Sequence, residues 1–274
     1  MRHIFFAVFL INTLSCQEDV FKKTHQTIWF TSPAKEWHEA LPLGNGRLGM
    51  MIFGDPKKER IQLNDDSLWP NDLGWTHPKG RPEDLKKIRE ALDKGDPETA
   101  DRLLVEKFSN KTILRSHQTL GDLNLQWKHD DIANYTRSLD LKRAIATTNY
   151  TVEGYQVEQK AFVSYPHKIM VITINTEHPK GLEGTISLQR PLDEDFETAS
   201  TKAIGQSLIM NGEVTQLKGA FRSNPAPIRN GVAFETHLEA HTNLGSVIPS
   251  TDKLKVKGVK SLVLYIASNS TYYT

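Results

Sequence analysis

The chain has 274 residues, of which 38% are hydrophobic and 24% are charged, and its formal net charge at pH 7 is +1. This composition is that of an ordinary globular protein, long enough for one large domain or two small ones. The near-neutral charge gives no reason to expect nucleic acid as a partner, and no run of about 18 apolar residues offers a membrane-spanning helix.

The first 16 residues differ from the rest and predict an export signal. A basic start precedes an apolar run from Ile4 to Ile11, and the only cysteine of the chain, Cys16, follows. A short apolar core behind a basic start is typical of a secretory signal peptide. Residues 13–16 also resemble a bacterial lipobox, although Thr13 stands where that motif usually has leucine, and the resemblance implies lipid attachment at Cys16.

We therefore expect a lipoprotein-type signal peptide at residues 1–16, a linker at residues 17–26 and a folded domain at residues 27–274. The protein would be exported by a bacterium and held at the periplasm or cell surface by an anchor in the outer or cytoplasmic membrane. A plain secretory peptide with a chance cysteine is the alternative. One cysteine excludes an internal disulfide, so the fold must depend on its core.

Short strands are predicted at the start of the folded part. Residues 27–30 form a brief apolar run that ends at a Ser-Pro pair. Residues 49–53 and 60–63 are two further runs on either side of the turn cluster at residues 54–58. This arrangement predicts a β-hairpin.

One segment has the periodicity of a helix. Leu85, Ile88 and Leu92 recur at positions i, i+3 and i+7, between a proline that suits a first helical turn and a glycine that suits a helix end. A second segment opens with an Asp-Pro pair and ends near Phe108. We predict two short helices, inserted near residues 82–108.

From about residue 120 the period changes to two, which is the period of a strand. Apolar residues alternate with polar ones, or fill a short run completely, in four segments: residues 123–125, 169–174, 234–241 and 262–267. Asn-Gly pairs at residues 211–212 and 230–231 read as turns between strands. The predicted fold is mainly β, a large antiparallel β-sandwich with the two-helix insertion.

Residues 44–49 spell G-x-G-x-x-G, the pattern of a dinucleotide-binding turn. That function requires a buried strand before the motif and a helix after it. Here Pro42 precedes the motif in a short, broken segment, and the next turn follows at Gly54, too soon for a helix. We interpret the glycines as residues of a hairpin entrance, which need positive φ or close backbone approach, and we expect no cofactor.

Two patterns invite a metal, and neither predicts one. His237 and His241 have the spacing of a helical zinc pair, but residues four apart on a strand lie roughly 13 Å apart. They alternate with apolar residues and share their face with glutamates, which favours a solvated sheet face. The acidic run at residues 193–195 lacks the alternating ligand spacing of a calcium loop, which favours solvated charge.

Tryptophans and carboxylates are the side chains that carbohydrate chemistry would use. Trp37, Trp69, Trp75 and Trp127 could stack on pyranose faces if exposed, although tryptophan is more often a core or interface anchor. Glycoside hydrolysis needs two carboxyl groups at a controlled separation. Acidic residues are plentiful, yet none stands in a setting that marks a raised pKa, so the sequence names no catalytic pair.

Five segments occur in an order and spacing that point to a family. They are WHEALPLGNGRLGM at residues 37–50, ERIQLNDDSLW at 59–69, LGDL at 120–123, YTRSLDL at 135–141 and FVSYP at 162–166. Together they resemble the amino-terminal domain of glycoside hydrolase family 95, the α-L-fucosidase family, over roughly residues 28–274. Residues 70–74 depart from it, because the family usually has a turn rich in serine and glycine there.

The resemblance implies a β-sandwich at residues 27–274 that precedes a linker and an (α/α)₆ barrel, where the barrel carries the catalytic groups. We expect the chain to be truncated before the barrel, so no catalytic residue is assigned to it. Arg47, Asn64 and Trp69 are candidates for a wall of the substrate site or for the barrel interface. Local hydrogen bonding and packing are the alternative roles of these three residues.

The implied function is that of a non-catalytic domain in an inverting hydrolase of terminal α-1,2-linked L-fucosides. Its partners would be its own carboxy-terminal catalytic domain and, through that domain, a glycan. Three alternatives stay open: an α-L-galactosidase of the same family, a free-standing carbohydrate-binding β-sandwich, and a related enzyme that acts by phosphorolysis. An export signal argues against phosphorolysis, since the sugar phosphate would be lost outside the cell.

Overall fold

The computed structural model describes residues 26–70, 79–109, 115–217 and 227–273. The predicted signal peptide, the lipid attachment at Cys16 and all but the last residue of the predicted linker lie outside these ranges, as does Trp75. No helix in the described ranges is long and apolar enough to cross a membrane.

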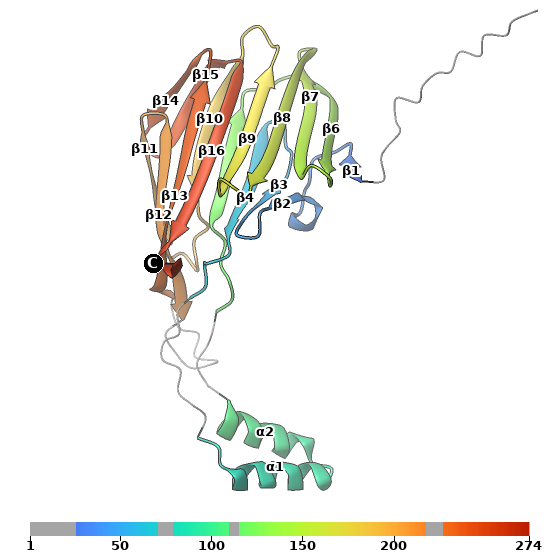
Figure 1. Cartoon of the computed structure of the whole chain (residues 1–274), viewed down its shortest axis with the longest axis vertical. Coiled ribbons are helices and arrows are strands. Elements are labelled where there is room, and N and C mark those ends of the chain that lie inside the picture. The colour runs from blue at the N-terminus through green and yellow to red at the C-terminus, as the bar shows by residue number, and fades with distance from the viewer. Residues whose placement is uncertain (1–25, 71–78, 110–114, 218–226, 274) are drawn as a thin grey trace, which may run out of the picture.

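The strands form two antiparallel sheets that pack face to face, which confirms the predicted β-sandwich (Figure 1). The nine-stranded sheet has the order β1 (Thr27–Phe30), β6 (Ile132–Asp140), β7 (Ile145–Val152), β8 (Tyr155–Ser164), β9 (Ile169–Thr176), β16 (Ser261–Ser270), β13 (Pro227–Thr242), β12 (Ser207–Leu217) and β11 (Ala199–Ile204). The seven-stranded sheet has the order β14 (Ser246–Ser250), β15 (Lys253–Val259), β10 (Leu182–Gln189), β5 (Gly121–Trp127), β4 (Lys58–Asp65), β3 (Leu48–Ile52) and β2 (Leu41–Gly44).

The period-two pattern places one face of each strand in the core between the sheets. The buried side chains include Leu123 and Leu125 of the smaller sheet and Ile172 and Ile174 of the larger one. The run at residues 262–267 is covered on one face only, because Tyr265 and Ala267 point outward and are exposed. Its apolar outer positions therefore do not indicate a second covering layer.

The two Asn-Gly pairs predicted to be turns lie inside strands. Gly212 pairs with Phe234 across β12 and β13, and a Cβ atom at Gly212 would lie 2.4 Å from the Phe234 ring. Gly231 has φ of 122° beside the register shift between Glu213 and Thr215, where a β-bulge needs such a residue. In both places the glycine serves the sheet, so the local turn signal was misleading.

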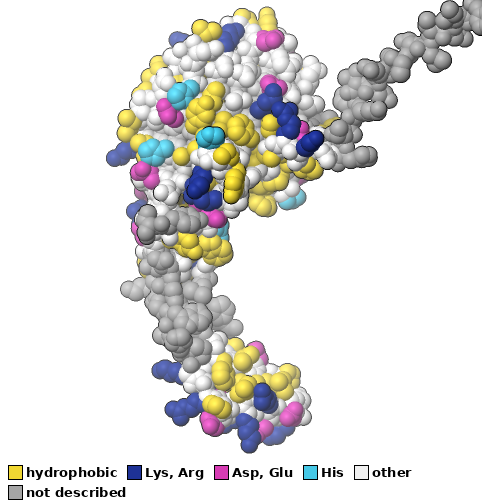
Figure 2. Space-filling view, viewed as in Figure 1, with side chains coloured by type: hydrophobic (Ala, Val, Ile, Leu, Met, Phe, Trp, Pro, Cys, Tyr) yellow, Lys and Arg dark blue, Asp and Glu magenta, His cyan; other side chains and the backbone are white. Residues whose placement is uncertain are grey.

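The two predicted helices are present as α1 (Pro82–Asp93) and α2 (Pro97–Phe108), inserted between β4 and β5. They pack on each other through Ile88 and small residues, in a cluster separate from the sandwich core (Figure 1). The predicted apolar face is wrong in part, because Leu85 and Leu92 are 39% and 55% exposed. Hydrophobic side chains are accordingly visible on the surface of this pair (Figure 2).

The G-x-G-x-x-G segment is itself a hairpin, made by β2 and β3. The side-chain oxygen of Asn45 accepts hydrogen bonds from the backbone N–H groups of Arg47 and Leu48, at 3.0 and 2.8 Å. Pro42 lies on the edge strand β2, where a missing N–H group is tolerated. β3 follows the turn directly, which confirms a glycine-rich hairpin. β3 begins at Leu48, one residue before the predicted run, and the short segment before the turn is the strand β2.

Substitution of Gly46 with alanine is expected to lower the free energy of unfolding by about 1–2 kcal/mol. Gly46 has φ of 94°, and an added Cβ atom would meet nothing within 4 Å, so the cost is conformational. Urea unfolding of Gly46→Ala measures this effect. Gly49→Ala is the matched control, because Gly49 lies in a strand with room for a Cβ atom; equal losses in the two variants would contradict the explanation.

Candidate functional site

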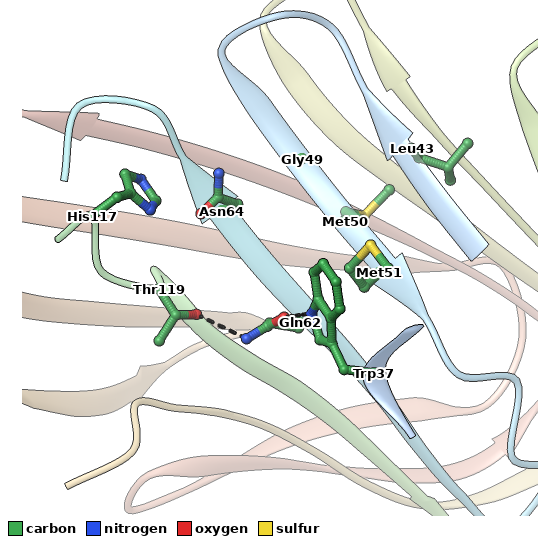
Figure 3. A pocket seen from close by; sticks show the side chains of 9 residues that line it. All are labelled: Trp37, Leu43, Gly49, Met50, Met51, Gln62, Asn64, His117 and Thr119. Atoms are coloured by element: carbon green, nitrogen blue, oxygen red, sulfur yellow. Dashed lines mark hydrogen bonds between the residues drawn. The ribbon is translucent and has the colours of Figure 1, made fainter. Parts of the chain in front are cut away.

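A depression of about 400 Å³ lies over β3 and β4, on the face of the seven-stranded sheet that points away from the core (Figure 3). The alternation of the strands turns Gly49, Gln62 and Asn64 outward, while Leu43 and Met50, which also line the depression, belong to the core. We call this depression the β3–β4 groove. Its lining includes Trp37, Gly49, Met51, Gln62, Asn64 and His117.

Trp37 and Gln62 form one end of the groove. Trp37 belongs to the short 3₁₀ helix η1 (Trp37–Glu39), and its indole N–H donates to the side-chain oxygen of Gln62 (Figure 3). The amide nitrogen of Gln62 lies 3.5 Å from the hydroxyl of Thr119. Because the indole is held at its nitrogen while the side chain stays 56% exposed, its ring is an ordered aromatic surface at the mouth.

His117 forms the other end of the groove (Figure 3). Its Nε2 atom hydrogen-bonds the backbone oxygen of Asp65 at 2.8 Å, and its ring meets that of Trp69 edge to face at a centroid distance of 5.4 Å. Trp69 is 50% exposed. The groove is thus flanked by two exposed tryptophans, of which Trp69 adjoins it through the histidine.

The structure places the three residues predicted from sequence at different depths. Asn64 lines the groove, and Trp69 lies next to it. Arg47 points inward, where it donates to the carboxylate of Asp65 at the end of β4 at 3.0 Å and to the backbone oxygen of Ser268 in the nine-stranded sheet at 2.6 Å. Arg47 therefore ties the β2–β3 hairpin to β16, while the other two residues face outward.

A buried carboxyl group was missed at the sequence level. Glu59 accepts hydrogen bonds from the backbone of Gly54 at 2.8 Å and from the Gln159 amide at 2.9 Å, which joins the two sheets. Burial raises the pKa of Glu59 to about 8. A raised pKa is typical of catalytic acids, but this side chain is enclosed between the sheets and does not line the groove, so its contacts are structural.

The acidic run at residues 193–195 is not simply solvated. Asp193 forms a two-pronged ion pair with Arg115, and the hydroxyl of Thr215 donates to it at 2.5 Å. The hydrogen bonds from Arg115 lower the pKa of the Asp193 carboxyl. Nearby, burial lowers the pKa of Arg190 to about 10. The ion-pair partners lie far apart in sequence, so no local pattern indicated them.

The two histidines of β13 are exposed, whereas Trp127 is buried. His237 and His241 are exposed on β13, and their Nε2 atoms lie 2.6 Å from the carboxylate of Glu235 and 3.0 Å from that of Glu239, which confirms the solvated sheet face. Trp127 is buried, and its ring stacks on that of His129, so it is a core residue. Within the described ranges, no group of three or more metal-binding side chains comes together.

Comparison with known proteins places these features in a family. Residues 28–274 match the model of the glycosyl hydrolase family 65 N-terminal domain. The chain is 28% identical over 258 residues to alpha-L-fucosidase 2 of Arabidopsis thaliana, covering 89% of this chain and 30% of that protein. It is 30% identical over 164 residues to a probable alpha-fucosidase A of Aspergillus oryzae, covering 56% of this chain and 22% of the relative. The chain thus spans less than a third of the length of these relatives.

Among solved structures, a putative kojibiose phosphorylase from the human microbiome aligns with a TM-score of 0.46 at 9% sequence identity. The alignment covers 90% of this chain and 32% of that one.

Proposed function

The chain belongs to the family of glycosyl hydrolase family 65 N-terminal domains, and from this we propose that it is the non-catalytic amino-terminal domain of an inverting, α-L-fucosidase-like glycoside hydrolase. The similarity to alpha-L-fucosidase 2 over 89% of the chain is the observation that carries the proposal. The five sequence segments described above favour family 95 within this group of enzymes, and that finer assignment is part of the proposal.

The chemistry would reside in the part of the enzyme beyond this span. Inverting hydrolysis needs a carboxylic acid that protonates the glycosidic oxygen and a base that activates water, with the carboxyl groups about 6.5–9.5 Å apart. The residues that line the β3–β4 groove include no carboxyl group, and the buried Glu59 is enclosed. This arrangement favours a structural, non-catalytic role for the sandwich.

Within that role, Asn64 and Trp69 face outward and would contribute to a wall of the substrate site or to the interface with the catalytic domain. Arg47 would act indirectly, since its bonds to Asp65 and Ser268 hold the hairpin that carries the groove. The basic and apolar pattern of residues 1–16, with Cys16 at its end, supports export and lipid anchoring at the periplasm or cell surface.

The product of the whole reading frame that encodes this chain is expected to release free L-fucose from 2′-fucosyllactose. Because an inverting enzyme delivers water to the face opposite the leaving group, proton NMR early in the reaction should show β-L-fucose before mutarotation. The chain of residues 27–274 alone, assayed in parallel, should release none.

Other products would contradict specific parts of this proposal. Early α-L-fucose would overturn inversion, and faster cleavage of an α-L-galactoside would favour the α-L-galactosidase. Formation of a sugar phosphate that requires inorganic phosphate would favour phosphorolysis. Release of no sugar by the whole product, together with glycan binding by the chain, would favour a free-standing binding module.

A further inference from the structure

The three glycines of the β2–β3 hairpin differ in what requires them. Gly46 has a positive φ, and a Cβ atom at Gly44 would lie 3.3 Å from the backbone oxygen of Leu48, which is a tight contact. Gly49 has neither constraint: its φ is not in the left-handed region, and a Cβ atom would make ordinary contacts at 3.5 Å and 3.6 Å. Folding of the hairpin therefore accounts for two of the glycines and leaves the third without a structural reason.

Gly49 lies in the floor of the β3–β4 groove, paired across the strands with Asn64 (Figure 3). Its neighbour Met51 on the same face is paired with Gln62. A side chain at Gly49 would rise from the sheet between Trp37 and His117 and occupy the depression. The missing side chain is thus what keeps the groove open, which is the feature expected where a ligand approaches the backbone closely.

The lining of the groove selects a chemical class of ligand. The residues that line it carry amide, hydroxyl, imidazole, indole, thioether and aliphatic groups and no carboxylate, ammonium or guanidinium group. Such a surface offers no strong attraction to an anionic ligand such as a phosphate. It combines an exposed indole ring with short polar side chains, which suits a ligand that has one apolar face and several hydroxyl groups.

We propose that the β3–β4 groove binds a neutral pyranose unit of a glycan. The C–H face of the sugar stacks on Trp37, whose ring is fixed by its hydrogen bond to Gln62. The ring hydroxyls exchange hydrogen bonds with the amide of Asn64 and the Nδ1 atom of His117, and Gly49 gives the sugar room above the sheet. The choice of a glycan over another neutral polyol rests on the proposed function.

Titration calorimetry of the chain with 2′-fucosyllactose, lactose and glucuronate tests this site. We expect both neutral sugars to bind, and we expect glucuronate to bind no more tightly than they do. Gly49→Leu should raise the dissociation constant by about tenfold or more because the leucine side chain fills the groove. Trp37→Ala should raise it by a similar factor because the stacking surface is lost. Tyr265→Ala removes an exposed aromatic ring from the opposite sheet and should leave binding unchanged.

Two results would overturn the site: no heat of binding with a chain whose far-ultraviolet circular dichroism shows intact strands, or equal affinities for Gly49→Leu and the unaltered chain. If a variant of the isolated chain aggregates, the same substitutions are read in the product of the whole reading frame, with lactose as the probe. Failure of the proposed function is distinguishable, because absence of fucose release from the unaltered whole product concerns catalysis and leaves these affinities as they are.

Discussion

Glutamine in place of Glu59 is expected to stabilise the domain at neutral and alkaline pH and to flatten the pH dependence of its stability. The pKa of this carboxyl is about 8 in the folded protein, above its ordinary value of 4.5. Between these values the folded state holds one more proton than the unfolded state, so the free energy of unfolding falls by about 1.4 kcal/mol per pH unit as the pH rises. From pH 5 to pH 8 the loss approaches about 4 kcal/mol.

The substitution keeps the hydrogen bonds of the site. The side-chain oxygen of the new glutamine can accept from the backbone N–H of Gly54, and its amide nitrogen can donate to Gln159 once that amide turns over. Since the variant carries no ionisable group there, its melting temperature should exceed that of the unaltered chain most at pH 8 and least at pH 5.

Thermal unfolding at several pH values, followed by circular dichroism, measures this difference. Glu177→Gln is the matched control because Glu177 is exposed and has no comparable burial to relieve. A melting temperature of Glu59→Gln that runs parallel to that of the control from pH 5 to pH 8 would show that the buried carboxyl is not penalised.

Removal of the Asp65 carboxylate is expected to destabilise the fold by about 3–5 kcal/mol. Asp65 is fully buried and accepts hydrogen bonds from Arg47 at 3.0 Å and from the backbone and hydroxyl of Ser67 at 3.2 and 2.7 Å. Asp65→Ala leaves the guanidinium without this counter-charge and the backbone N–H of Ser67 without its acceptor, while the Ser67 hydroxyl keeps the Ser270 hydroxyl as a partner. Urea unfolding monitored by circular dichroism gives the loss.

The ion pair between Arg60 and Asp122 supplies the comparison. It joins neighbouring strands on the outer face at 3.1 Å, and its arginine side chain is 42% exposed, so Asp122→Ala should cost less than about 1 kcal/mol. Adding Arg47→Met to Asp65→Ala should recover part of the loss, because the charge that Asp65 balances is then gone as well. Equal losses in the two single aspartate variants would contradict the importance of burial.

The sheets and helices were largely predictable because each depends on local periodicity. Alternation in the chain found β5 and β13, and the i, i+3, i+7 spacing found α1. The errors have a common origin: Gly212 and Gly231 look like turn residues locally, but the Phe234 ring and the bulge in the pairing of β12 with β13 are what require glycine there. Local sequence does not contain that information.

The candidate site was less predictable, because its parts meet only through long-range pairing. Trp37, Asn64 and His117 come from three separate segments, and the sequence alone grouped Asn64 with Arg47, whose side chain turns the other way. The pattern G-x-G-x-x-G did mark the right hairpin. Its third glycine, however, could be separated from the other two only by the register between β3 and β4.

Because of the point at which α1 and α2 are inserted, the stability of the sandwich should depend little on the length of the insertion. β4 ends at Asp65 and β5 begins at Gly121, yet Leu63 and Gly121 are paired, so the chain leaves and re-enters the sheet at one place. Lengthening a loop whose ends are already joined adds entropy cost only logarithmically. The α1–α2 pair can therefore be exchanged without repacking the core, provided that Leu68 and Leu120 stay in it, and the same junction is suited to carrying a grafted reporter domain.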